Sequence, residues 1–330
     1  MSERESYPPS WQQVMQDYVL KEVLPLGCSK VKILYGNAGE PRNSQLNQVQ
    51  HAAKQQNYYC VYLDISRCTN KLTDLVSLYH HIIQDIPVQT LCQNLQARLY
   101  AAFGYSAADL EPYQGDLLML LVEKEHNLVT NAQKLLRQQI NSLVRDLDIS
   151  FSHRIFLSRL MDELAGGRIK QRESLFAWLK GEKLPQQEKT ELNLFETIKK
   201  ANARIWLYSL NEILCFAGLQ GTVLIWDNFE AIYSEGKSPV HWTKSSRDDL
   251  YELLRQIIDD MDVLSRFLLL ICTDAAFLKD EKRGAQSYHA LWMRIVPGVK
   301  HSFRHNPYAD LVAVPENPEL TSYKEVTYEN

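Results

Sequence analysis

The chain has 330 residues, of which 45% are hydrophobic, and this is enough for one large domain or two ordinary ones with a sizeable core. Lys and Arg number 36 against 40 Asp and Glu, so the formal net charge of -4 excludes an overall basic field for nucleic acid, although not a local basic patch. The six cysteines form no C-x-x-C pair or zinc-type cluster, and the longest apolar run, FLLLIC from Phe267, is too short to span a bilayer, so we expect a cytoplasmic protein with reduced thiols and no membrane association.

The first part of the chain alternates helix and strand signals. Apolar residues recur at helical spacing over 10–24, and a β-rich run follows at 31–36. A second helix is expected at about 44–56, a second strand at 58–66 and a third helix at 72–86. This order of strands and helices predicts a parallel sheet.

Helical periodicity replaces the strand signals from about residue 88 to 217. Strands return in GTVLIWDNFEAI from Gly221 and in RFLLLICTD from Arg266, with a helix from Ser246 between them. A long helical block inside an α/β pattern predicts an inserted subdomain. The expected division is 1–104 as the N-terminal half of the α/β domain, 105–217 as a helical insertion, 218–297 as the C-terminal half, and 298–330 as a docking or loosely ordered tail.

The stretch VKILYGNAGEPRNSQL places Gly36 and Gly39 in the turn between a strand and a helix. A phosphate-binding loop has the pattern G-x-x-x-x-G-K-[ST] at such a turn. Its backbone N–H groups wrap the phosphates, its lysine reaches the terminal phosphates, and its hydroxyl binds magnesium. The residues that follow the glycines here are Glu40, Pro41, Arg42 and Asn43.

Each of these four residues departs from the chemistry of a phosphate loop. Pro41 lacks an N–H group to donate, and Glu40 puts a carboxylate beside the phosphates. Arg42 keeps a positive charge, but its planar fork does not replace a compact ammonium group. Asn43 has no hydroxyl for magnesium. The turn is therefore either a phosphate loop that has lost its chemistry or an ordinary strand–turn–helix corner.

Two later predicted strands end in residue types that are typical of a nucleotide site. TVLIWD ends in Asp227, like a Walker B strand, in which the aspartate anchors magnesium and a following glutamate polarises the attacking water. The following residue here is Asn228, which cannot take a proton, and Glu230 stands two residues further on. Thr273 and Asp274 end the next strand, where AAA-type ATPases place a polar sensor; a capped strand end is the alternative. Together with the first turn, these strand ends favour a nucleotide site that has degenerated.

Basic residues follow the last of these strands. Arg283 and Arg294 are candidates either for arginine fingers that act on a neighbouring subunit or for a solvated basic face. We favour the solvated face for Arg294 and leave Arg283 open. The segment GVKHSFRHNPY at 298–308, with Lys300 and Arg304, is the best local candidate for contact with a phosphate backbone, and a loop docked on the core is the alternative.

In the order of these pieces the chain resembles the P-loop ATP-binding proteins of bacteriophage-exclusion (BREX) and related bacterial defence systems, distant relatives of the AAA ATPases. The resemblance covers most of the chain outside its helical middle. It rests on VKILYGNAGEPRNSQL, VYLDISRCTNKLTDLVSLYHHIIQDI, LFAWLKGEKL, GLQGTVLIWDNFEAI and ICTDAAFLKDEKRGAQSYHALWMRI. Against the family pattern G-x-x-G-x-G-K-[ST], Gly36 and Gly39 match, whereas Pro41, Arg42 and Asn43 replace the third glycine, the lysine and the hydroxyl. The family's usual D-E pair of the Walker B strand reads D-N.

The resemblance implies an α/β fold of the P-loop NTPase (AAA-like) type, with a parallel sheet flanked by helices and a large helical insertion. It implies a pseudo-ATPase that serves as a structural or regulatory subunit of a bacterial anti-phage defence or DNA-handling complex. Other subunits of the complex, a second copy of the chain and DNA are the candidate partners. ATP and magnesium would bind weakly or not at all, and no residue would be catalytic or hold a resident metal. The relic nucleotide site would comprise Gly36, Gly39, Arg42, Asn43, Asp227, Thr273 and Arg283.

Two other functions stay open. The chain could be an active ATPase in which Arg42 replaces the lysine and Glu230 acts as the base, completed by an arginine from a neighbouring subunit. It could also be a DNA-binding adaptor whose helical block at 105–217 makes the contact.

Overall fold

The structure is a computed structural model that describes residues 10–36, 40–68, 72–124, 126, 128–166, 171–234, 240–300 and 306–313, without the side chains of residues 40, 41 and 300. The chain divides into two compact units. Met1–Asp74 and Gln220–Asn330 form the first, called here the α/β unit, and Leu75–Leu219 forms the second, called here the helical unit. The helical unit thus begins upstream of residue 105, the boundary expected from the sequence.

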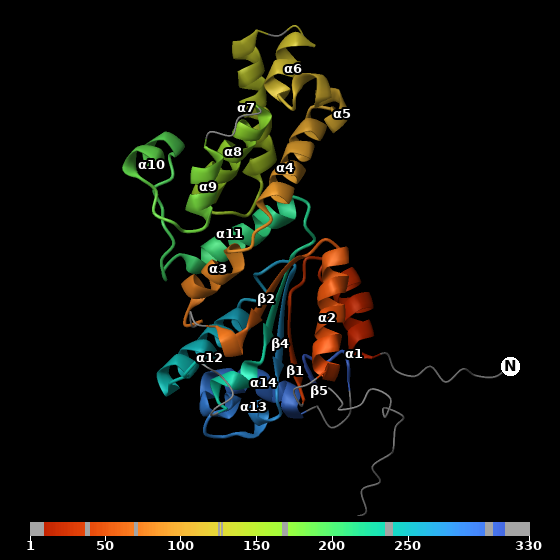
Figure 1. The fold of residues 1–330 in the computed structure, drawn as a ribbon, viewed down its shortest axis with the longest axis vertical. Helices are drawn as coiled ribbons and strands as arrows, with labels where there is room; N and C mark the ends of the chain where they lie inside the picture. Colours follow the sequence, from red (N-terminus) through yellow and green to blue (C-terminus); the bar gives the residue numbers. More distant parts are fainter. Residues whose placement is uncertain are drawn as a thin grey trace, which may run out of the picture. The chain divides into compact units, whose positions relative to one another are not determined.

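The α/β unit is built on a five-stranded sheet with strand order β2-β3-β4-β1-β5 (Figure 1). All neighbouring strands are parallel. This confirms the expected α/β class, and a parallel sheet flanked by helices is consistent with a P-loop NTPase-like fold. The strands are β1 (Lys30–Tyr35), β2 (Tyr59–Asp64), β3 (Thr222–Asp227), β4 (Phe267–Thr273) and β5 (Leu311–Ala313).

Helices cover both faces of this sheet, which is why its central strands are largely apolar. All residues of β3 and β4 are buried, as expected for parallel strands enclosed on both faces. Figure 1 shows α1 and α2 on one face and α12, α13 and α14 on the other. On the second face the ring of Phe229 stacks on Trp226 and packs against Phe277. The helical segments are α1 (Trp11–Gln13), its continuation η1 (Val14–Val23), α2 (Glu40–Gln55), η2 (Ile65–Arg67), η4 (Phe229–Ile232), α12 (Lys244–Asp259), α13 (Ala276–Lys279), η5 (Ala285–Ser287) and α14 (His289–Lys300).

The segment expected to be a tail contains the edge strand β5. Leu311 pairs with Ile33 in the parallel register with β1. The buried Lys32 ammonium donates to the carbonyl oxygens of Tyr308 (2.5 Å) and Ala309 (2.6 Å), which fixes the chain as it enters the strand. Of the segment expected to be a docking or loosely ordered tail, residues 311–313 belong to the sheet, and residues 308 and 309 are held against it by Lys32.

The helical unit has an aromatic core. The rings of Trp178 and Trp206 lie 4.7 Å apart, and the buried His153 ring lies 4.8 Å from Trp206. The long helical segment that begins at Leu117 is divided into two helices, α6 and α7, by a turn in which His126 has a φ of 53°. The elements of the unit are α3 (Leu75–Ile83), α4 (Val88–Ala102), α5 (Ala107–Leu110), η3 (Glu111–Tyr113), α6 (Leu117–Glu123), α7 (Val129–Arg145), α8 (Phe151–Ala165), α9 (Arg172–Leu179), α10 (Gln186–Leu192) and α11 (Ala203–Phe216).

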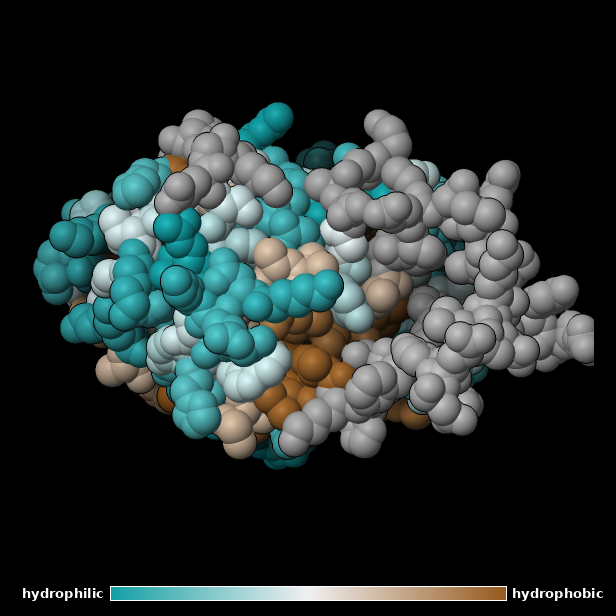
Figure 2. Space-filling view, turned by 90° about the horizontal axis from the view of Figure 1, so that it is seen from below, coloured by the Kyte–Doolittle hydropathy of each residue, from teal (hydrophilic) through white to brown (hydrophobic). Residues whose placement is uncertain are grey.

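On the coloured part of the face shown in Figure 2, hydrophilic residues predominate, and one cluster of hydrophobic residues is visible near the centre of the view. Within the described residues, every helix is too short or too polar to cross a membrane.

Candidate functional site at the ends of the parallel strands

The candidate site lies where β1, β3 and β4 end. Because these strands are parallel, their carboxyl ends meet at one edge of the sheet. Tyr35 pairs with Thr273, and the backbone N–H of Gly36 donates to the carbonyl oxygen of Thr273 (3.0 Å). Asp227 lies at the same edge, in register with Asp64 of β2. The structure thus brings together Gly36, Asp227 and Thr273, three of the residues singled out from the sequence. Gly39 lies outside the described residues.

Arg42 is the centre of the site. It lies in the first turn of α2, and only 2% of its surface is exposed. Its Nη2 donates to Asn228 Oδ1 (2.8 Å) and to Glu230 Oε1 (3.1 Å), and its Nη1 donates to Glu230 Oε2 (3.4 Å). Nη2 also lies 3.4 Å from Asp227 Oδ1. The guanidinium therefore makes a two-pronged contact with one carboxylate and an ion pair with a second.

The two acidic partners keep this buried guanidinium charged. Burial alone lowers the pKa of Arg42, but the charge and hydrogen bonds of Glu230, with the charge of Asp227, raise that pKa above its ordinary value. Asp227 and Glu230 are buried as well. A buried ion pair of this kind is costly to break, because the group left behind is an uncompensated charge in a poorly solvated place.

Both carboxylate oxygens of Asp227 already accept hydrogen bonds. Oδ1 accepts from the backbone N–H of Asn228 (2.8 Å), and Oδ2 accepts from the hydroxyl of Tyr62 (2.7 Å). Burial and the contact with Asp227 raise the pKa of the Tyr62 hydroxyl, so it stays protonated and remains a donor. This carboxylate is thus held by the protein's own donors.

The side chain of Asn228 bridges Arg42 on α2 and Asp64 at the end of β2. Its backbone has a φ of 52°, in the left-handed region that asparagine adopts more readily than most residues. Its side-chain oxygen accepts from Arg42, while its Nδ2 donates to Asp64 Oδ1 (3.0 Å). An amide can serve both neighbours at once because it carries a donor and an acceptor. The residue that cannot act as a general base therefore has a structural role.

A cavity of about 430 Å³ lies beside the Arg42 cluster, next to the ends of β2 and β3. It contains Asn43, the residue at the position of the magnesium-binding hydroxyl, and its walls are largely polar side chains. The lining residues are Asn43, Leu46, Asn47, Tyr62, Asp64, Arg67, Asp227 and Asn228.

Thr273 belongs to a neighbouring hydrogen-bond network. The hydroxyl of Tyr233 lies 2.7 Å from Thr273 Oγ1 and donates to Asp274 Oδ1 (2.8 Å). Burial raises the pKa of Tyr233, so its hydroxyl stays protonated. The two strand-end residues expected to act as a sensor are therefore tied to a tyrosine of the α/β unit.

The two arginines after β4 are placed differently from each other. Arg283 lies in the turn between α13 and η5, where its backbone N–H donates to Asp280 Oδ1 (3.0 Å) and its carbonyl accepts from Tyr251 (2.7 Å). Arg294 donates from Nε and Nη2 to the carboxylate of Asp259 on α12 (2.9 and 3.0 Å). In the basic segment at 298–308, residues 301–305 and the side chain of Lys300 lie outside the described part of the chain.

Three members of the site were not foreseen from the sequence. Asp64 had a usable signal, because it ends an apolar strand just as Asp227 does. Tyr62 and Tyr233 had none, since a tyrosine in or after a strand is equally typical of a core. The sequence suggests Glu230 only as the base of the active-ATPase alternative, whereas in the structure it is the main partner of Arg42.

Among the described residues, the placement of Arg42 and Asp227 does not fit the roles that a loop cation and a Walker B aspartate have in a magnesium–nucleotide complex. A phosphate-loop cation must reach the terminal phosphates, and a Walker B aspartate must offer an oxygen toward magnesium. Here the cation and the aspartate are paired with each other and enclosed. Within the described residues, no group of three or more His, Cys, Asp or Glu side chains is placed to hold a metal ion elsewhere.

Comparison with known protein families gives a match over most of the chain. The family model described as "BREX system ATP-binding protein BrxC/D" matches residues 19–314. No curated protein and no solved structure matches the chain.

Proposed function

The chain belongs to the family of BREX system ATP-binding proteins BrxC/D, and we propose that it is a catalytically degenerate member of that family. The family match confirms the resemblance that its motifs indicate. In this proposal it is a pseudo-ATPase whose nucleotide site is filled by its own side chains. Membership of the BREX system places it among the proteins of a multi-subunit defence system, and its proposed part there is structural or regulatory.

The pairing of Arg42 with Glu230 and Asp227 is the observation that carries the proposal. In a working site the P-loop cation contacts the nucleotide's phosphates and the Walker B carboxylate acts on the magnesium ion. In this chain the guanidinium contacts the carboxylates directly, at 3.1 and 3.4 Å. Nucleotide would have to separate a buried ion pair before it could bind, and this opposes binding.

The residues available for hydrolysis support the same proposal. Asn228 stands where the family usually has a glutamate, and its amide has no proton-accepting carboxylate. Glu230, the other candidate base, holds Arg42 with both of its oxygens. The active-ATPase alternative needs Arg42 and Glu230 for two separate tasks, whereas here each is the other's partner.

Turnover of ATP by the purified chain tests the proposal. We expect no magnesium-dependent hydrolysis above the level of the Asp227→Ala variant, and no saturable heat of binding when Mg·ATP is titrated into the protein. Hydrolysis that requires magnesium and disappears in Asp227→Ala would contradict the proposal and favour the active ATPase.

A second experiment asks whether a partner protein completes the nucleotide site. The tagged chain is isolated with the proteins that accompany it, once as wild type and once as Asp227→Asn, which keeps the shape of the side chain. We expect equal ATP turnover from the two complexes. An Asp227→Asn complex that still assembles but loses its turnover would show that this site is completed by a neighbouring subunit.

A further inference from the structure

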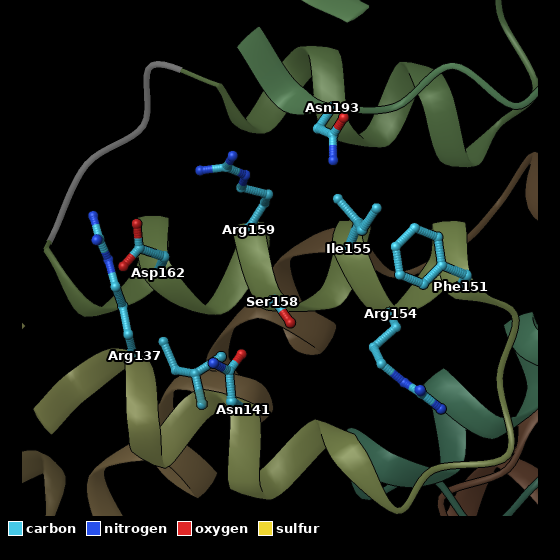
Figure 3. A pocket seen from close by; sticks show the side chains of 10 residues that line it. Arg137, Asn141, Phe151, Arg154, Ile155, Ser158, Arg159, Asp162 and Asn193 are labelled. Atoms are coloured by element: carbon cyan, nitrogen blue, oxygen red, sulfur yellow. The ribbon is translucent and has the colours of Figure 1, made fainter. Parts of the chain in front are cut away.

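The helical unit carries a groove that none of the nucleotide-site arguments uses. It has a volume of about 370 Å³ and lies between α7 and α8, with Asn193, the residue that ends α10, at its far side. Figure 3 shows Phe151, Ile155 and Arg159 projecting from one helix and Arg137 and Asn141 from the next. We call it the arginine groove. Its lining residues are Arg137, Ile140, Asn141, Phe151, Arg154, Ile155, Ser158, Arg159, Asp162 and Asn193.

The spacing of the residues on α8 explains why a groove forms there. Phe151, Ile155 and Arg159 follow one another at intervals of four residues, so they form a single stripe along the helix. The opposite side of α8, with Phe156 and Leu160, is buried in the core. The stripe faces outward even though it begins with two large apolar residues, and 74% of Phe151 is exposed. An outward apolar stripe is typical of a surface that contacts another molecule.

The charge of the groove selects the kind of ligand. Three arginines line it against one acidic residue, Asp162. Arg137 and Arg159 are exposed, and neither pairs with a carboxylate within the part of the chain that the structure describes. Arg154 donates to the carbonyl oxygen of Leu147 (3.0 Å) and is thereby held in place. Guanidinium groups that are not paired internally suit a ligand with carboxylate or phosphate groups.

The surroundings of the groove favour a peptide over a nucleic acid. Residues 75–219 contain 16 Lys and Arg against 16 Asp and Glu, so the helical unit has no basic field of the extent that a nucleic-acid backbone requires. The groove also has aliphatic walls, from Ile140 and Ile155, and an aromatic edge. Apolar walls with arginines at the rim match an acidic segment that carries an apolar side chain.

We propose that the arginine groove binds a short acidic segment of a partner protein, with an aliphatic or aromatic side chain between Phe151 and Ile155 and carboxylates on Arg137 and Arg159. This site is separate from the nucleotide-site proposal and does not depend on it. It gives the chain a defined surface for holding another protein.

Selection of displayed random peptides on the full-length chain tests this site. The enriched peptides are synthesised with a fluorescein label, and their affinity is measured by fluorescence anisotropy. We expect them to combine Asp or Glu with a large apolar residue. Arg137→Glu and Arg159→Glu are each expected to weaken binding by about tenfold or more, and Phe151→Ser to weaken it as well.

The variants have matched controls. Arg137 and Arg159 are exposed, so their replacement leaves the core intact, which circular dichroism verifies. Lys183→Glu makes the same charge change at an exposed position of the helical unit that does not line the groove, and its binding should equal that of the wild type. Three results would overturn the proposal: no enrichment, enriched peptides that bind the Arg137→Glu/Arg159→Glu double variant as well as the wild type, or preferential binding of labelled oligothymidylate that the double variant loses.

Discussion

The guanidinium of Arg42 contacts the carboxylate of Glu230 at 3.1 Å, although 188 residues separate them along the chain. The first turn of α2 carries one partner and the short helix after β3 carries the other. Both are buried, and Asp227 and Asn228 complete the contact. The pair is thus an internal link between α2 and η4, the short helix that follows β3.

Replacement of Arg42 by alanine should destabilise the protein strongly. It leaves the carboxylates of Asp227 and Glu230 buried without a cation, and we expect a loss of about 3–5 kcal/mol in the free energy of unfolding, measured with urea. Arg67→Ala is the matched control, because Arg67 also pairs with an acidic residue, Asp64, but with 83% of its side chain exposed. That variant should stay within about 0.5 kcal/mol of the wild type.

A double-mutant cycle measures the interaction between Arg42 and Glu230 separately from what each side chain contributes on its own. If Arg42 and Glu230 act mainly on each other, Arg42→Ala combined with Glu230→Ala should cost less than the sum of the single changes, with a coupling of about 1–3 kcal/mol. Additive losses would show that each side chain has an independent role, as the active-ATPase alternative requires.

Tyr62 supports the site from the neighbouring strand, and Tyr62→Phe removes only its hydroxyl. The change deprives Asp227 Oδ2 of a donor, and we expect a loss of about 1–2 kcal/mol in the free energy of unfolding. Tyr18→Phe is the control: Tyr18 is exposed to a similar extent, 43% against 44%, and its described contact is a ring contact with Tyr308. Equal stability of the two variants would show that the Tyr62–Asp227 hydrogen bond contributes nothing.

Much of the α/β unit could be predicted from the sequence, because its strands are apolar runs that end in polar residues. The strands expected at 31–36 and 58–66, and those expected in TVLIWD and RFLLLICTD, correspond to β1, β2, β3 and β4, with ends that differ by at most two residues. The fifth strand escaped because β5 has three residues and lies in a polar segment. Its strand character comes from pairing with β1 rather than from its own pattern.

The internal pairing of the site could not be predicted. The sequence predicts that the lysine, the hydroxyl and the glutamate of a nucleotide site are replaced, and only the active-ATPase alternative assigns tasks to both Arg42 and Glu230, as two separate groups. Their contact depends on how α2 and the segment after β3 are brought together by the parallel sheet, and local patterns do not encode a contact of that range. The start of the helical unit at Leu75 is a similar case, since α3 packs with α11 although it follows β2 in the chain.

His153 should make the stability of the helical unit depend on pH. Burial lowers its pKa from 6.5 to about 3, so the folded protein holds the neutral ring. The stabilisation is complete above the unfolded pKa of about 6.5 and is lost as pH falls from there toward 3, because only the unfolded chain takes up the proton. Lowering the pH from 7.5 to 5 should therefore reduce the free energy of unfolding by about 2 kcal/mol through this group.

Urea unfolding followed by tryptophan fluorescence measures this effect, since Trp178 and Trp206 both contact the His153 ring. His153→Leu removes the titrating group and should reduce the difference between the two pH values by about the same 2 kcal/mol, whatever it does to stability at pH 7.5. An unchanged difference in that variant would assign the pH dependence to other groups.

The last prediction concerns Asn228, the amide between Arg42 and Asp64. Asn228→Asp keeps the size of the side chain and the oxygen that accepts from Arg42, but it replaces the nitrogen that donates to Asp64 Oδ1 at 3.0 Å. Two carboxylates at that distance cannot both be charged without cost, so we expect a loss of about 1–3 kcal/mol near neutral pH. The loss should shrink as the pH falls, because protonating one of the pair restores a donor. Asn47→Asp adds the same charge at an exposed position of the same cavity and should change stability little. If Asn228→Asp is as stable as Asn47→Asp at neutral pH, the bridge to Asp64 is not what holds Asn228 in its left-handed conformation, and an acidic residue at this position would be compatible with the filled site.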